Sequence, residues 1–293
     1  MKLLFSCLYI SLTFHLSLIE AKPYPDHNTP LLSTLESAKK LKWEIGSMIG
    51  GATYLGLLTW NWGSSNSFKM HNEGWISTDT HSAGADKFGH MYSSFLINEL
   101  FTKQLINKTG NVTNSAIKST LFATGVMLWV ETFDGYSVDH GFSYEDVAFN
   151  TMGIGLSYLK NTIPGLDEKI DFRAEYLPTH NANHVVTDYS GYTFLLVTRL
   201  NGFKLLKSTP LKYIELQLGY HTEGFRKNDN IFYNEKKAEV LFGVGLNLSE
   251  VFFKPINKHI NSPAIDYADN FFRYFQMPST YITKPLNTRT ASY

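Results

Sequence analysis

Acidic residues, a lysine and a histidine lie near the ends of apolar segments, where they could do chemistry together. Asp86 and His90 are four residues apart at the start of one segment, with Lys87 beside them. Glu131 and Asp134 are three residues apart at the end of the next segment. Since residues three or four apart share a helix face, each pair would present its side chains in one direction.

A third apolar segment begins with a polar stripe. Ser143 is a suitable N-cap, and Asp146 lies in the first turn, where the helix dipole favours acids. Asp146 and Asn150 share a face, which the small residues Gly153 and Ser157 extend. If the three helices alternate up and down with short loops, their polar ends lie at the same end of a bundle. The sequence therefore predicts a polar mouth there.

Carboxylates and a histidine that converge could serve in three ways, which the sequence alone leaves open. They could hold a divalent cation, with nitrogen from His90 and oxygen from Asp134 and Asp146. They could perform acid/base chemistry, because crowding acids in an apolar bundle separates their pKa values. They could also form a satisfied hydrogen-bond network, with Lys87 as counter-charge. The candidate catalytic residues are His90, Asp86, Glu131, Asp134 and Asp146, and the candidate binding residues are Lys87, Ser143 and Asn150.

Several familiar catalytic patterns are missing from the sequence. It lacks the paired Glu-x-x-His motif of di-iron bundles, the His-Glu-x-x-His zinc motif and a nucleophile elbow. Its one cysteine, Cys7, lies inside the predicted leader. A mature chain without cysteine would have no disulfide, no thiolate metal site and no cysteine nucleophile. No cofactor other than a divalent cation is indicated.

Four apolar runs predict helices at about 43–60, 86–105, 115–133 and 143–160. In the first, two glycines four residues apart, Gly46 and Gly50, would let another backbone approach closely. Charges or amides interrupt each run near one end. The four helices are therefore expected to form a short membrane-embedded bundle or a bundle pressed against a membrane.

The periodicity changes after Pro178. Three segments, 192–200, 213–220 and 238–248, alternate as strands do and predict a small antiparallel sheet. Residues 271–275 are expected to form a final interfacial or core segment.

The expected fold class is α+β, with a bundle of about four apolar helices followed by a small antiparallel β region. The predicted divisions are a signal peptide at 1–21, an N-terminal arm at 22–42, a helical bundle with the polar mouth at 43–165 and a β-rich region at 166–293.

The first residues have the features of a secretory signal. Met1 and Lys2 give a positive start, an apolar stretch follows to Ile19, and the small residue Ala21 suits cleavage. We therefore expect secretion across the inner membrane, to the periplasm or the outer membrane. The formal net charge is zero, which argues against nucleic acid as a partner because phosphate binding needs a cationic excess.

Three motifs resemble a known family: D-K-F-G-H at 86–90, E-T-F-D-G-Y-S at 131–137 and G-F-S-Y-E-D-V-A-F-N-T-M-G at 141–153. They resemble the YfiM-like family of predicted periplasmic lipoproteins and, more distantly, VanZ-like membrane proteins. Segments 188–193 and 218–224 resemble the longer envelope members. The resemblance implies an envelope protein without an established reaction. Because no cysteine follows the leader, attachment to a membrane would have to come from the helices or the aromatic strands.

The sequence thus favours an uncharacterised bacterial envelope protein that is associated with a membrane and binds lipid or an envelope partner. The alternative is a hydrolase or transferase on envelope lipid or glycan. In that case His90 would act as base, and Asp134 or Asp146 would orient it or hold a metal. Whether the protein is an enzyme, what its substrate is and how it oligomerises are left open.

Overall fold

The structure is a computed structural model that describes residues 32–180, 182–226 and 229–293 of the chain. The predicted signal peptide, 1–21, lies outside the described residues. So does most of the predicted N-terminal arm, 22–42.

The chain divides into two compact units. Unit 1 takes the residues up to Glu73 together with 93–162, and unit 2 takes 74–92 together with 163–293. One helix, α4 (Ala85–Thr109), runs without a break from the residues of unit 2 into those of unit 1.

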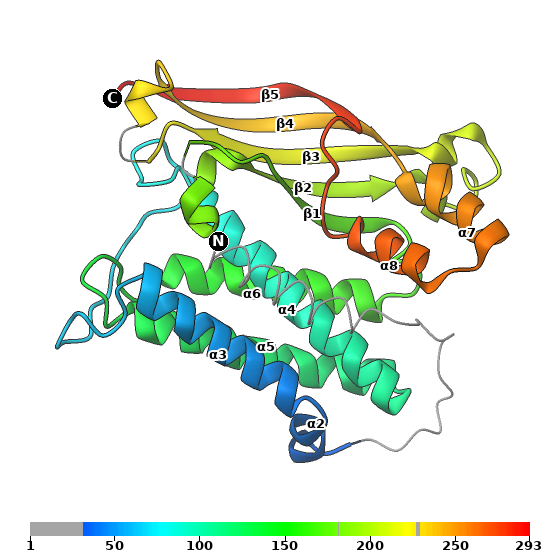
Figure 1. The fold of residues 1–293 in the computed structure, drawn as a ribbon, viewed down its shortest axis with the longest axis horizontal. Coiled ribbons are helices and arrows are strands. Elements are labelled where there is room, and N and C mark those ends of the chain that lie inside the picture. The colour runs from blue at the N-terminus through cyan, green and yellow to red at the C-terminus, as the bar shows by residue number, and fades with distance from the viewer. Residues whose placement is uncertain (1–31, 181, 227–228) are drawn as a thin grey trace. The chain divides into compact units, whose positions relative to one another are not determined.

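The helices begin and end within a few residues of the predicted positions, which confirms the expected bundle of about four apolar helices. They are α2 (Thr34–Lys40), α3 (Lys42–Thr59), α4, α5 (Val112–Asp134) and α6 (Tyr144–Thr162) (Figure 1). Side chains cap α2, α5 and α6. The Ser33 hydroxyl accepts from the Glu36 N–H before α2, and the Asn111 side chain accepts from the Asn114 N–H at the start of α5.

Helices α5 and α6 pack through small and polar side chains. The buried face of α5 repeats at intervals of three and four and comprises Ser115, Ala116, Ser119, Ala123, Val126, Met127 and Val130. On α6 the predicted stripe of Asp146, Asn150, Gly153 and Ser157 is buried. Such small side chains allow two helices to approach closely.

The glycines of α3 do not act as predicted. A Cβ added at Gly46 or Gly50 would find no described atom within 4 Å. The expected close approach of another backbone to this face is therefore wrong for the described residues. The glycine that is tightly packed lies further along the helix, at Gly56, against the ring of Trp62.

Unit 2 contains one antiparallel sheet with its five strands in chain order (Figure 1). The strands are β1 (Ile170–Tyr176), β2 (Tyr192–Arg199), β3 (Ile214–Glu223), β4 (Lys236–Leu246) and β5 (Tyr281–Ala291). The three predicted strands correspond to β2, β3 and β4, so the α+β fold class is confirmed. Strands β1 and β5 were not expected.

The remainder of unit 2 consists of short helices and loops. Helices α7 (Lys254–Ile260) and α8 (Pro263–Phe271) follow β4. The predicted segment 271–275 is the end of α8 and the turn after it, where Tyr274 is fully buried. In the described part of the chain, no helix has both the length and the apolar content that a bilayer crossing requires.

Candidate functional site

The first turn of α4 holds a buried ion pair. The Lys87 Nζ donates to Asp86 Oδ2 at 2.9 Å, and the Ser82 hydroxyl also donates to Asp86. Burial acts to raise the pKa of Asp86, but the charge of Lys87 and the hydrogen bond from Ser82 outweigh it and hold this pKa at about 2. Asp86 is therefore a carboxylate at neutral pH, and the nearly inaccessible Lys87 supplies counter-charge.

Polar side chains join the end of α5 to the start of α6. The Asn150 Nδ2 donates to Glu131 Oε1 at 3.0 Å, and both side chains are buried. Ser143 caps α6, because its hydroxyl accepts from the Asp146 N–H at 3.2 Å. The same hydroxyl donates to the fully buried Glu145 at 3.1 Å. The Ser143 cap thus holds the Glu145 side chain at the start of α6, and the Asn150 amide holds the Glu131 side chain at the end of α5.

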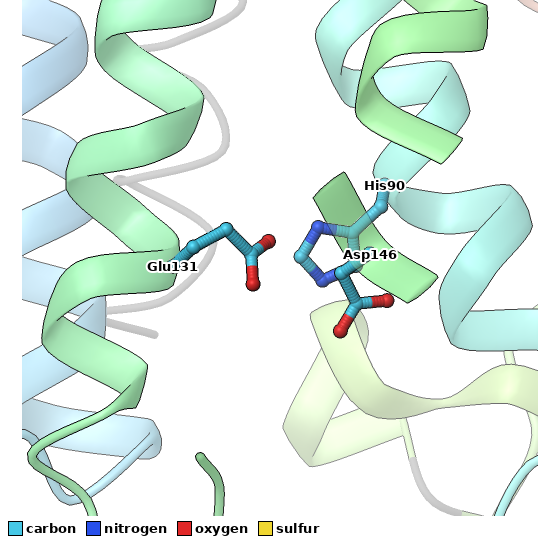
Figure 2. A group of neighbouring side chains, drawn as sticks. All are labelled: His90, Glu131 and Asp146. Carbon is cyan, nitrogen blue, oxygen red and sulfur yellow. The ribbon is translucent and has the colours of Figure 1, made fainter. Parts of the chain in front are cut away.

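Glu131 on α5 and Asp146 on α6 have carboxylate oxygens within 4.8 Å of each other, and both residues belong to unit 1. Both side chains are buried. Figure 2 draws them together with His90, which lies on α4 in unit 2 and is half-buried.

Asp134 has another position. Its Oδ1 accepts from the Trp62 indole Nε1 at 2.6 Å, and Trp62 is buried. The group with ligand spacing therefore contains Glu131 where the sequence analysis placed Asp134. A catalytic or ligand role for Asp134 stays a prediction.

One further acid with ligand spacing was not foreseen. Glu73 has a carboxylate oxygen within 4.8 Å of one of Asp146, and both residues belong to unit 1. Glu73 lies in the polar segment before α4, which has no periodic pattern that would single it out. The sequence analysis therefore could not add this residue to the site.

Two carboxylates at this spacing supply oxygen ligands that a divalent ion such as Mn²⁺ accepts. The same groups could accept and return a proton. They could also act only as a hydrogen-bonded tie between helices.

The sheet of unit 2 holds a second buried polar cluster, which the sequence analysis missed. The Arg173 guanidinium donates to both carboxylate oxygens of Glu215, at 2.7 and 2.9 Å, and to Asp171 at 3.0 Å. Arg199 and Arg273 also pair with Asp171, at 3.0 and 3.2 Å. The side chains of Asp171 and Glu215 are fully buried. Such mutual satisfaction is typical of a structural network.

Comparison with known proteins gives one family match. Residues 72–162 match the family described as "Predicted periplasmic lipoprotein (DUF2279)". This confirms the predicted resemblance to such lipoproteins over these residues and supports a location in the cell envelope. The YfiM-like and VanZ-like resemblances stay predictions. No curated protein and no solved structure matches the chain.

Proposed function

We propose that this envelope protein binds an anionic membrane surface through the outward face of its sheet. The main observation behind this proposal is that the sheet buries polar side chains and exposes apolar ones. On β3, Glu215 and Gln217 are buried, whereas their neighbours Leu216 and Leu218 are 36% and 48% exposed. A sheet packed in water normally buries the apolar set and exposes the polar one.

The exposed apolar side chains are neighbours in the register of four strands. Leu196, Leu218 and Phe242 lie in one cross-strand row, and Leu216, Val244 and Ile282 lie in the next. The exposed set on this outward face is Leu196, Leu216, Leu218, Phe242, Val244, Leu246 and Ile282. A contiguous apolar patch of this kind marks an interaction surface.

The charge beside this face favours an anionic surface. The connection between β2 and β3, residues 200–213, contains three lysines and no acid. Two of them, Lys204 and Lys207, flank Leu205, which is 89% exposed. Lysines next to exposed apolar side chains are typical of segments that lie at the boundary between lipid headgroups and acyl chains.

The edge strand argues against a second copy as occupant. Strand β5 carries Lys284 and Pro285, and its pairing with β4 shifts register between Val240 and Leu241. Lysine, proline and a bulge on an edge strand all oppose pairing with another sheet edge. A partner is therefore expected on the apolar face of the sheet and not along the edge strand. The lysines of the connection between β2 and β3 favour a lipid surface as that partner.

Vesicle binding tests the proposal. Changing Leu218 and Phe242 to serine removes about 1 kcal/mol of apolar burial at each position, so binding should fall roughly 30-fold. Sedimentation with vesicles that contain phosphatidylglycerol measures this. Lys204→Gln with Lys207→Gln should weaken binding to these vesicles but not to phosphatidylcholine vesicles.

The matched control is a pair of leucines on α3. Leu57 and Leu58 are 61% and 62% exposed, so they offer at least as much apolar surface as the sheet pair. Leu57→Ser with Leu58→Ser should leave vesicle binding unchanged. If instead the helix pair abolishes binding and the sheet pair does not, the sheet is not the membrane surface.

A second candidate function is the binding of a divalent cation by Glu131 and Asp146. The ligand spacing of these two buried carboxylates, both in unit 1, is the observation that favours it. We expect the chelator-treated protein to bind Zn²⁺ or Mn²⁺ in calorimetric titration, and Glu131→Gln to weaken this at least tenfold. Glu235→Gln changes an exposed carboxylate and serves as control. Wild-type protein that binds neither ion would leave these residues as a structural network.

A further inference from the structure

We propose that a cavity of unit 2 holds the end of one acyl chain of an anionic amphiphile, with Arg289 beside its headgroup. This inference rests on the proposed function and names the ligand class. The cavity has a volume of about 180 Å³ and lies between the segment before α4 and strands β3 to β5. Its principal lining residues are Ile76, Phe88, Tyr220, Ala238, Val240 and Arg289.

The walls of the cavity are mainly apolar, although Ser77, Thr78 and Asn287 also contribute to the lining. Phe88 stacks on the Tyr220 ring with a centroid distance of 4.5 Å. The Tyr220 hydroxyl donates to the Ala83 carbonyl, so the one polar atom of this ring is already engaged. A ligand therefore meets the ring carbons of Tyr220 together with Ile76 and Val240. Apolar walls of this kind exclude water and accept hydrocarbon.

The rim of the cavity is cationic. Arg289 Nη1 donates to the Ile76 carbonyl at 3.0 Å, which fixes the guanidinium while it retains further N–H donors. A guanidinium binds carboxylate and phosphate groups especially well.

The cavity and the outward apolar face of the sheet involve the same side of β4. Val240 lines the cavity, and Phe242 lies two residues further along on that side. The register agrees, because Val240 pairs with Tyr220 and Phe242 pairs with Leu218. An acyl chain whose end fills the cavity could thus extend over the face that we assign to the membrane.

The size of the cavity favours a chain end over a whole ligand. Sites for complete small molecules usually measure roughly 300–1,000 Å³, and this cavity is smaller. A linear chain can place its terminal methylenes inside and leave the headgroup at the rim. A branched or cyclic ligand of similar mass could not.

Dodecanoate, lyso-phosphatidylglycerol and dodecanol are the test ligands, each below its micellar concentration. The first two share a chain and an anionic group but represent free fatty acid and phospholipid, and dodecanol has no charge. We expect wild-type protein to bind at least one anionic ligand in calorimetric titration. Arg289→Gln should weaken anionic binding about tenfold and leave dodecanol binding unchanged.

Filling the cavity is the decisive change. Val240→Trp should reduce binding of the anionic ligands at least tenfold, and Ala238→Leu provides a second filling variant if the first does not fold. Leu286→Trp is the control, because Leu286 is 64% exposed on β5 and does not line the cavity. Unchanged dodecanoate binding by a folded, filled variant would overturn the inference.

The vesicle experiment separates this inference from the proposed function. Wild-type protein that binds vesicles but none of the test ligands would refute the cavity assignment and leave the membrane surface in place. Protein that binds dodecanoate but no vesicle would refute the membrane surface and leave the cavity assignment in place.

Discussion

Arg173→Met is expected to lower the free energy of unfolding by about 3–5 kcal/mol. Arg173 is nearly inaccessible, and its guanidinium contacts Glu215 through two oxygens and Asp171 through one. Methionine fills a similar volume, so the main loss is electrostatic. Burial already raises the pKa of Glu215 against the opposing effect of Arg173, so without the guanidinium this fully buried carboxyl must carry an uncompensated charge or take up a proton.

A urea titration of Arg173→Met against wild type measures this loss. Arg289→Met is the control, because Arg289 is exposed and the change should cost about 1 kcal/mol or less. Adding Glu215→Gln to Arg173→Met should restore part of the stability, since a neutral amide replaces the Glu215 carboxyl group that has lost its guanidinium partner. Asp171 would keep Arg199 and Arg273 as partners. A loss below 1 kcal/mol for Arg173→Met would contradict the account of a buried, satisfied network.

The helices were predictable because their sequence signals are local. Each has a long apolar run, and residues such as Ser143 and Asn111 mark where a helix begins. The polar residues of α5 and α6 could be assigned to faces from their spacing alone. Short loops then predict that Glu131 and Asp146 lie at one end of the bundle.

The two missed strands differ in their sequence patterns. In β1 the charged side chains Asp171 and Arg173 alternate with Phe172 and Ala174, so the strand signal was present but was overlooked, and both sets of side chains are buried. In β5 nearly every residue is exposed and the residues do not alternate in polarity, so its strand structure comes from pairing with β4. Tertiary context, not local propensity, produces β5.

The polarity of the sheet could not be read from the sequence. Alternation shows that Leu216 and Leu218 share one face and that Glu215 and Gln217 share the other. It does not show which face is covered. The usual assumption would bury the leucines, and the structure buries the polar pair because arginines on β1 and β2 meet Glu215 across the sheet. The proposed membrane surface follows from this reversal.

Trp62→Ala is expected to cost about 3–5 kcal/mol of unfolding free energy, as large aromatic truncations in a core do. The Trp62 ring is 5% exposed and contacts the rings of Trp60 and Phe133 at centroid distances of 5.7 and 5.3 Å. It also lies against Gly56, where an added Cβ would come within 2.1 Å of it. Alanine would leave a cavity and remove the indole donor from Asp134.

Trp43→Ala is the matched control, because the same truncation at a ring that is 78% exposed should change stability by less than 0.5 kcal/mol or so. Trp62→Phe keeps the packing and removes the hydrogen bond, so its cost should be about 1–2 kcal/mol. Asp134→Asn keeps an acceptor oxygen and should cost no more than Trp62→Phe. If Asp134→Asn proves neutral while Trp62→Phe is costly, the hydrogen bond to the indole requires the acceptor oxygen of Asp134 and not its charge. If both cost about the same, Asp134 serves to anchor the indole.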